Sequence, residues 1–150
     1  HAMPEHLLGR RRDDYVLSVD QIEQFRRDGY VTLRNVLTGE ELATIEPSFQ
    51  RFIRGEVSGM GRDFCDMSGP YDRRFEDFSL VNAVLPRKYR PELQGNIFER
   101  RAASIARQLI GDSATLDYDQ FLAERPAKPD AIFTWHQDLG LDFGRSIGFT

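Results

Sequence analysis

Residues 94–123 read QGNIFERRAASIARQLIGDSATLDYDQFLA, and the spacing of apolar residues changes within this stretch. In residues 94–110 apolar side chains recur every three or four positions, which predicts a helix with one buried face, and Gly111 suits its end. In residues 116–123 apolar and polar residues alternate, which is typical of a strand. Helices first and strands last favour an α+β fold, or a mainly β fold flanked by helices.

An earlier helix is predicted by the residues that follow the N-terminal arm. Ser18 has N-cap chemistry, and Gln21 three residues later completes a capping box. Gly29 suits the left-handed position that ends a helix. Residues 30–33 (YVTL) favour β structure, so a short strand is predicted there.

A further helix is predicted after Thr38, which forms a second capping box with Glu41. Pro47 lacks a backbone donor and is expected to kink or restart this helix. Residues 62–89 are predicted to be irregular and rich in aromatic side chains. The aromatic residues are Phe64, Tyr71, Phe75 and Phe78. Their side chains either line a ligand pocket or pack over a core, and we favour packing over a core. Residues 55–90 are the best local candidate for an element that covers a pocket.

The C-terminal part is predicted to hold a turn at residues 125–130 and a second strand at residues 131–136. Residues 1–17 are expected to be a tag remnant, His1-Ala2 before Met3, and an N-terminal arm. Residues 18–150 are expected to be the N-terminal part of a single domain. A chain of 150 residues suits one domain with a real core.

Composition excludes several classes of function. The net charge of −4 argues against a general nucleic-acid-binding protein. No apolar run is long enough to span a membrane, and the start has no apolar signal core, so we expect a cytoplasmic protein without a membrane partner. Cys65 is the only cysteine, so an intrachain disulfide is excluded, and we expect a buried or loop cysteine rather than a reactive thiol.

The residues that carry chemistry are Trp135-His136-Gln137-Asp138. Two residues apart on an extended strand, His136 and Asp138 project to the same side. One imidazole and one carboxylate are two-thirds of the 2-His-1-carboxylate triad that holds non-heme Fe(II). The alternative is a histidine at the edge of the core and an aspartate in a turn before Gly140. Asp117 and Asp119 could likewise form a carboxylate pair, although a solvated strand face is favoured.

Three blocks of sequence resemble the phytanoyl-CoA dioxygenase family of Fe(II)- and 2-oxoglutarate-dependent oxygenases. The first is LSVDQIEQFRRDGYV at residues 17–31, and the second is LRNVLT at residues 33–38. The third is WHQD at residues 135–138, with a Lys/Pro turn at residues 126–129 just upstream. Their order and spacing match those of the family, which makes the resemblance more specific than the His-x-Asp pair alone.

The resemblance implies a double-stranded β-helix, the cupin-like jelly roll, behind N-terminal helices. It implies that His136 and Asp138 are metal ligands for Fe(II), and that Gln120 and Gln137 contact the co-substrate 2-oxoglutarate. It implies an oxidoreductase: a dioxygenase that hydroxylates or otherwise oxidises a C–H bond of a small-molecule substrate with O₂.

The family pattern also contains a distal His and an Arg on later strands, which this chain does not contain. We therefore keep three interpretations: a fragment of a longer enzyme, a site completed by a second chain or a homo-oligomer, and a short protein with a lost or altered site. The alternative functions are a non-catalytic binding or assembly domain and a different cupin-type metal enzyme that uses only His136, Asp138 and water.

Overall fold

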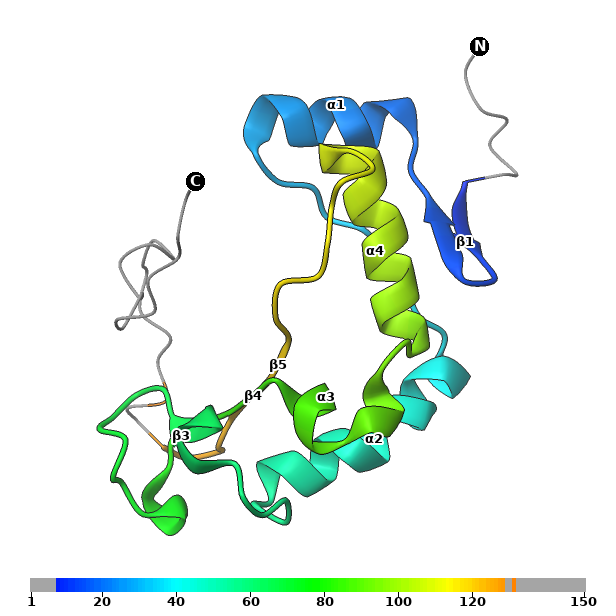
Figure 1. Cartoon of the computed structure of the whole chain (residues 1–150). Helices are drawn as coiled ribbons and strands as arrows, with labels where there is room; N and C mark the ends of the chain where they lie inside the picture. The colour runs from blue at the N-terminus through cyan, green and yellow to red at the C-terminus, as the bar shows by residue number, and fades with distance from the viewer. Residues whose placement is uncertain (1–7, 129–130, 132–150) are drawn as a thin grey trace.

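The structure, a computed structural model, describes residues 8–128 and residue 131. Its helices are α1 (Val19–Asp28), α2 (Gly39–Ile53), α3 (Pro86–Tyr89) and α4 (Ile97–Ile110), with 3₁₀ turns η2 (Gly61–Asp63), η3 (Phe75–Asp77) and η4 (Pro91–Leu93). Its strands are β1 (Gly9–Arg11), β2 (Asp14–Val16), β3 (Phe64–Asp66), β4 (Leu80–Val84) and β5 (Gln120–Glu124). Figure 1 shows α1 at one end of α4 and α2 at the other.

The two predicted capping boxes are confirmed. Ser18 accepts a hydrogen bond from the backbone N–H of Gln21, whose side chain accepts one from the backbone N–H of Ser18. Thr38 and Glu41 form the same reciprocal pair at the start of α2. These bonds satisfy N–H groups that a helix leaves unpaired at its first turn. Asn96 caps α4, which begins three residues after the predicted start.

Other predictions of secondary structure are wrong. Residues 30–33 form no strand, and Tyr30 is exposed, because β-favouring residues need a neighbouring strand to pair with. The predicted strand at residues 116–123 begins only at Gln120. Pro47 lies inside α2, which continues to Ile53, so the helix does not restart there; the alternative expectation, a kink at Pro47, stays a prediction.

Sequence reasoning missed the short strands β1, β2 and β3 and also β4, which lies at the centre of the three-stranded sheet. The sheet has the order β3-β4-β5 and is antiparallel throughout, with Cys65 opposite Asn82 and Asn82 opposite Leu122. Four of the five residues of β4 are buried. A strand buried on both faces reads as a continuous apolar run, so the alternation that marks a half-buried strand is absent.

The core lies between α2 and one face of this sheet. Phe52 and Ala83 are fully buried, and Met60 and Leu93 complete the buried cluster. The ring of Phe121 on β5 packs against Phe52 with 5.5 Å between ring centroids. Burial of large apolar side chains is the main stabilising term in such a layer of helix on sheet.

The aromatic side chains of residues 62–89 pack together, as the favoured interpretation predicted. The rings of Phe64, Phe75 and Phe78 lie 5.4–5.5 Å apart in pairs. Tyr71 is the exception, because it is exposed and has the guanidinium of Arg62 over its ring.

The described part of the N-terminal arm is ordered. β1 and β2 form an antiparallel hairpin, and β2 packs against α4. Tyr15 and Leu17 are buried there, and the side chain of Gln108 donates a hydrogen bond to the carbonyl of Tyr15. The same side chain accepts one from the backbone N–H of Leu17. The side chain of Gln108 on α4 thus supplies hydrogen-bond partners for backbone groups at the end of the hairpin.

Arg101 of α4 joins three segments from a buried position, with 3 % of its side chain exposed. Its guanidinium donates to both carboxylate oxygens of Glu41, at 2.5 and 2.6 Å. It also donates to the carbonyls of Arg12 and Val36. The hydrogen bonds from Arg101 and from the backbone of Thr38 lower the pKa of Glu41 from 4.5 to about 2.

The fold is therefore a mixture of helices and antiparallel sheets. Within the described residues the three-stranded sheet does not close on itself, and the jelly roll stays a prediction. In that same part of the chain, no helix has the length and apolar character needed to cross a membrane.

We predict that Arg101→Met lowers the free energy of unfolding by about 2–3 kcal/mol, because the carboxylate of Glu41 and two carbonyls lose their donors. Arg100→Met is the matched control. Arg100 pairs with Asp13 at the surface, so its loss should cost less than about 0.5 kcal/mol. Urea denaturation of the two variants measures both values.

The difference between wild type and Arg101→Met should depend on pH. The pKa of Glu41 is lower in the folded protein, so its contribution to stability is complete above pH 4.5 and is lost as the pH falls towards about 2. Equal losses in the Arg100 and Arg101 variants would contradict this role for Arg101.

Candidate active site

The three-stranded sheet has two faces with different chemistry. On one face Phe64, Ala83 and Phe121 lie in register and pack against the core. Because side chains alternate along a strand, the next row, Cys65, Asn82 and Leu122, belongs to the opposite face. We call this opposite face the polar face of the sheet, because it carries Asn82 and Gln120 beside the apolar side chains of Leu80, Val84 and Leu122.

Gln120 is the one predicted site residue that lies in the described part of the chain. It is the first residue of β5, is exposed, and pairs with Val84. The register places it on the polar face, diagonally next to Asn82. His136, Gln137 and Asp138 lie outside the described residues. The structure therefore fixes where Gln120 sits and leaves the metal ligands as a prediction.

A cluster of charged side chains adjoins Gln120. Asp119 precedes it, and Arg87 reaches towards Asp119 at 3.6 Å and towards Glu99 at 3.7 Å. Burial raises the pKa of the Asp119 carboxyl, and Arg87 opposes that shift. The favoured prediction of a solvated strand face does not hold for Asp119, since residues 112–119 form no strand and this carboxyl is partly buried.

A cavity of about 330 Å³ lies beside this cluster, lined by Leu85, Arg87, Lys88, Gln94 and Glu99. Leu85 has a left-handed backbone, with φ of 54°, and its N–H donates to the carbonyl of Asp119. A left-handed conformation is strained for a residue other than glycine, and such strain is common near functional sites. Charged and polar side chains thus gather near the start of β5, whereas Gln120 itself is exposed and does not line the cavity.

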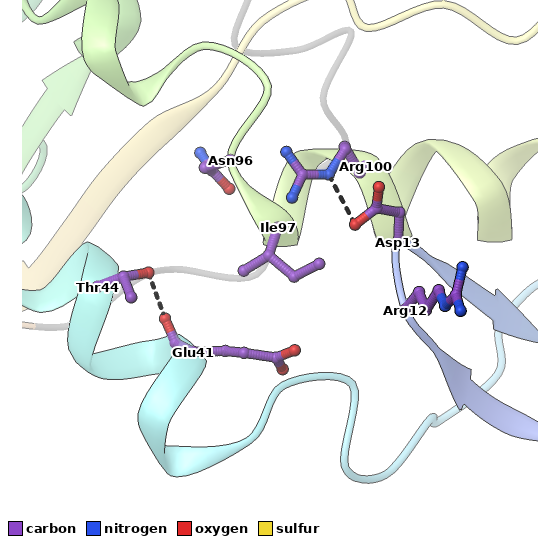
Figure 2. Close-up of a pocket in the computed structure, with 7 residues that line it drawn as sticks. All are labelled: Arg12, Asp13, Glu41, Thr44, Asn96, Ile97 and Arg100. Atoms are coloured by element: carbon purple, nitrogen blue, oxygen red, sulfur yellow. Dashed lines mark hydrogen bonds and ion pairs between the residues drawn. The ribbon is translucent and has the colours of Figure 1, made fainter.

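A larger cavity, of about 480 Å³, lies between the hairpin, α2 and α4 (Figure 2). Its charged groups are largely paired with one another: Arg100 lies 3.2 Å from Asp13, and Glu41 is held by Arg101. Its lining contains none of the predicted site residues, and consists of Arg12, Asp13, Glu41, Thr44, Asn96, Ile97 and Arg100.

The described part of the chain contains no cluster of side chains that could hold a metal ion. Among residues 8–128 and 131, no three His, Cys, Asp or Glu side chains lie close enough together to hold a metal ion. Cys65 is buried, as predicted, and burial raises the pKa of its thiol. A thiol in that state is a poor nucleophile.

Asp66, which sequence reasoning missed, anchors the end of β3. Its buried carboxylate accepts hydrogen bonds from Ser68, from the backbone N–H groups of Ser79 and Leu80, and from Arg73. Burial alone would raise its pKa, but these bonds outweigh burial and hold the pKa of Asp66 well below its usual range. They connect β3 to the start of β4.

Asn82 was also missed, although the sequence contains a signal for it. It is the single polar residue in the apolar run LVNAV at residues 80–84. Its side chain is buried, with 4 % of the residue exposed, and its amide nitrogen faces the sulfur of Cys65 at 3.9 Å. Burying a polar group lowers the stability of the folded protein unless the group is hydrogen-bonded. An asparagine inside an apolar strand is therefore unexpected.

Comparison with known proteins identifies two distant relatives. The chain is similar to the ectoine dioxygenase of Bordetella bronchiseptica, with 24 % identity over 124 residues, and to that of Bordetella parapertussis, with 26 % identity over 125 residues. Each alignment covers 82 % of this chain and 37 % of the relative, so the chain spans little more than a third of the length of these relatives. No family model matches the chain, and no solved structure matches it.

We predict that Asp66→Asn lowers the free energy of unfolding by about 2–3 kcal/mol, because an amide nitrogen cannot accept the N–H bonds that converge on this carboxylate. The pKa of Asp66 is lowered in the folded protein. Its contribution is therefore complete above the ordinary value of 3.8 and declines as the pH falls below it.

Denaturation curves at pH 7 and pH 3 measure this effect, with the exposed Asp72→Asn as control. A loss of stability in Asp66→Asn that is no larger than in Asp72→Asn would show that Asp66 does not anchor the sheet.

Proposed function

We propose that this protein is an Fe(II)- and 2-oxoglutarate-dependent dioxygenase that hydroxylates or otherwise oxidises a C–H bond of a small molecule. The observation that carries the proposal is the similarity to two ectoine dioxygenases over 82 % of the chain. The His136-x-Asp138 pair supports it, since one imidazole and one carboxylate suit Fe(II). The net reaction converts substrate, 2-oxoglutarate and O₂ into oxidised substrate, succinate and CO₂.

In this proposal His136 and Asp138 hold the iron, and bound iron with 2-oxoglutarate supplies the oxidising chemistry. Gln120 and Gln137 bind the co-substrate. The position of Gln120 supports its role, because its exposed amide lies on the polar face and can donate N–H bonds to a carboxylate. The fold proposed around this site is the jelly roll.

A second chain or a second copy of this chain is part of the proposal. β3 and β5 are the edges of the described three-stranded sheet, so each leaves backbone N–H and C=O groups available for another strand. Added strands would extend the sheet towards a jelly roll and could contribute further metal ligands.

The direct experiment measures binding of Fe(II) without O₂ and release of succinate from 2-oxoglutarate, with ectoine as the first substrate. We expect the wild-type protein to bind Fe(II) and to release succinate. His136→Ala and Asp138→Ala should each weaken Fe(II) binding by more than the roughly 10–100-fold that loss of an outer-shell partner costs. His6→Ala is the control histidine. Equal Fe(II) affinity in all three variants would contradict the proposed metal ligands.

We predict that Gln120→Leu weakens binding of 2-oxoglutarate about tenfold, the effect of losing a hydrogen bond to a charged group. Its thermal stability should change little, because Gln120 is exposed. Calorimetric titration of 2-oxoglutarate into the Fe(II)-loaded protein measures the affinity. Glu124→Gln, an exposed position at the other end of β5, is the control. Unchanged affinity in Gln120→Leu would contradict its role while leaving the metal ligands untouched.

A further inference from the structure

β5 lies at one edge of the three-stranded sheet and is bonded to β4 on one side only. The backbone N–H of Arg125 donates to the carbonyl of Ser79, and that of Leu85 donates to the carbonyl of Asp119. Successive residues of a strand direct their backbone groups to alternate sides, so the odd-numbered residues of β5 bond to β4. The residues whose N–H and C=O groups point away from β4 are therefore Gln120, Leu122 and Glu124.

The outward side of β5 is open in the described part of the chain. Within residues 8–128 and 131, no group is hydrogen-bonded to the backbone of Gln120, Leu122 or Glu124. The strand also lacks the usual protection of an edge, because its sequence QFLAE contains no proline or lysine and its register with β4 has no bulge. This edge is therefore a template for another strand.

The opposite edge, β3, offers fewer open groups. β3 has three residues, of which Phe64 and Asp66 alternate away from β4. The backbone N–H of Phe64 donates to the carbonyl of Gly61, and the carbonyl of Asp66 accepts from the backbone N–H of Gly69. The turns before and after β3 thus occupy part of its outward side, and β5 is the edge better suited to pairing.

The open side of β5 is complementary to itself. When two copies of β5 run antiparallel with Leu122 opposite Leu122, Gln120 lies opposite Glu124 of the other copy. Each outward residue then belongs to a hydrogen-bonded pair, and each pair exchanges two N–H···O=C bonds. The charges agree with this register, because Asp119 lies opposite Arg125 and no like charges meet.

The same register joins the apolar faces of the two sheets. The two-fold axis that relates the strands is perpendicular to the sheet, so the core faces of both copies lie on the same side. On that face Phe121 lies opposite Ala123 of the other copy, and both residues are only half-buried in the single chain. Pairing therefore covers apolar surface as well as backbone groups.

We propose that β5 binds β5 of a second copy of this chain in this register, so that two three-stranded sheets form one continuous sheet. The inference rests on the part of the proposed function that includes a second chain, and it names that chain, the edge and the register. Because both copies use the same strand, the interface closes at two copies. The two β3 strands then become the outer edges of the joined sheet.

The first measurement is the mass of the metal-free protein in solution by light scattering after size exclusion. We expect twice the chain mass of 17.3 kDa for the wild type. Leu122→Lys and Leu122→Glu each place like charges opposite one another at the two-fold axis, so each should raise the dissociation constant of the dimer at least about tenfold. An equal mixture of these two variants should form heterodimers. Leu122→Thr, a neutral strand former, is the matched control and should stay dimeric.

Amide hydrogen exchange separates strand pairing from folding. The backbone N–H of Leu122 faces the open edge, whereas that of Ala123 faces β4. Both should exchange slowly in the wild-type dimer. In Leu122→Lys the N–H of residue 122 should exchange fast, while that of Ala123 stays slow because the single sheet is intact.

Three results would overturn the proposal: a wild-type protein that is monomeric at its highest soluble concentration, equal dimerisation of the Lys variant, the Glu variant and their mixture, or a mixture that forms no heterodimer. The outcome is distinct from that of the proposed enzyme activity. Succinate release by a monomer would count against the β5 pairing alone. A dimer that binds no Fe(II) and releases no succinate would count against the dioxygenase alone.

Discussion

The buried guanidinium of Arg101 is the constraint on which the arrangement of elements depends. A guanidinium has five N–H donors, and in a place with little water each donor needs an acceptor. The acceptors come from Glu41, Arg12 and Val36, so α4, α2 and the hairpin turn must meet at one point. With α2 held there, Phe52 covers one face of the sheet, and the other face carries Gln120 and Asn82.

Local signals in the sequence predicted local structure well. The capping boxes at Ser18 and Thr38 need only residues three positions apart, and both are present. Strands depend on partners that are distant in the chain, which explains the errors. Residues 30–33 have the composition of a strand and form none, whereas β4 was hidden in an apolar run because both of its faces are covered.

In the candidate site, too, local sequence patterns could be read from the sequence, whereas features that depend on strand pairing could not. The His136-x-Asp138 pair was predicted from a pattern with fixed spacing, and Gln120 was predicted from the family resemblance; the roles of all three residues stay predictions. Asn82 could not be identified, because its place on the polar face depends on the register that puts it opposite Leu122 and diagonal to Gln120. A buried amide inside an apolar strand is a feature of packing, and only the paired strands reveal it.

We propose that this protein uses O₂ and 2-oxoglutarate to oxidise a small molecule. The most direct measurement is the reaction under ¹⁸O₂, with ectoine as substrate and mass spectrometry of the products. We predict one ¹⁸O atom in succinate, and a second ¹⁸O atom in the hydroxylated product when substrate oxidation is coupled to decarboxylation of 2-oxoglutarate. Succinate formed without ¹⁸O, or no succinate from Fe(II)-loaded protein, would contradict the proposed dioxygenase function.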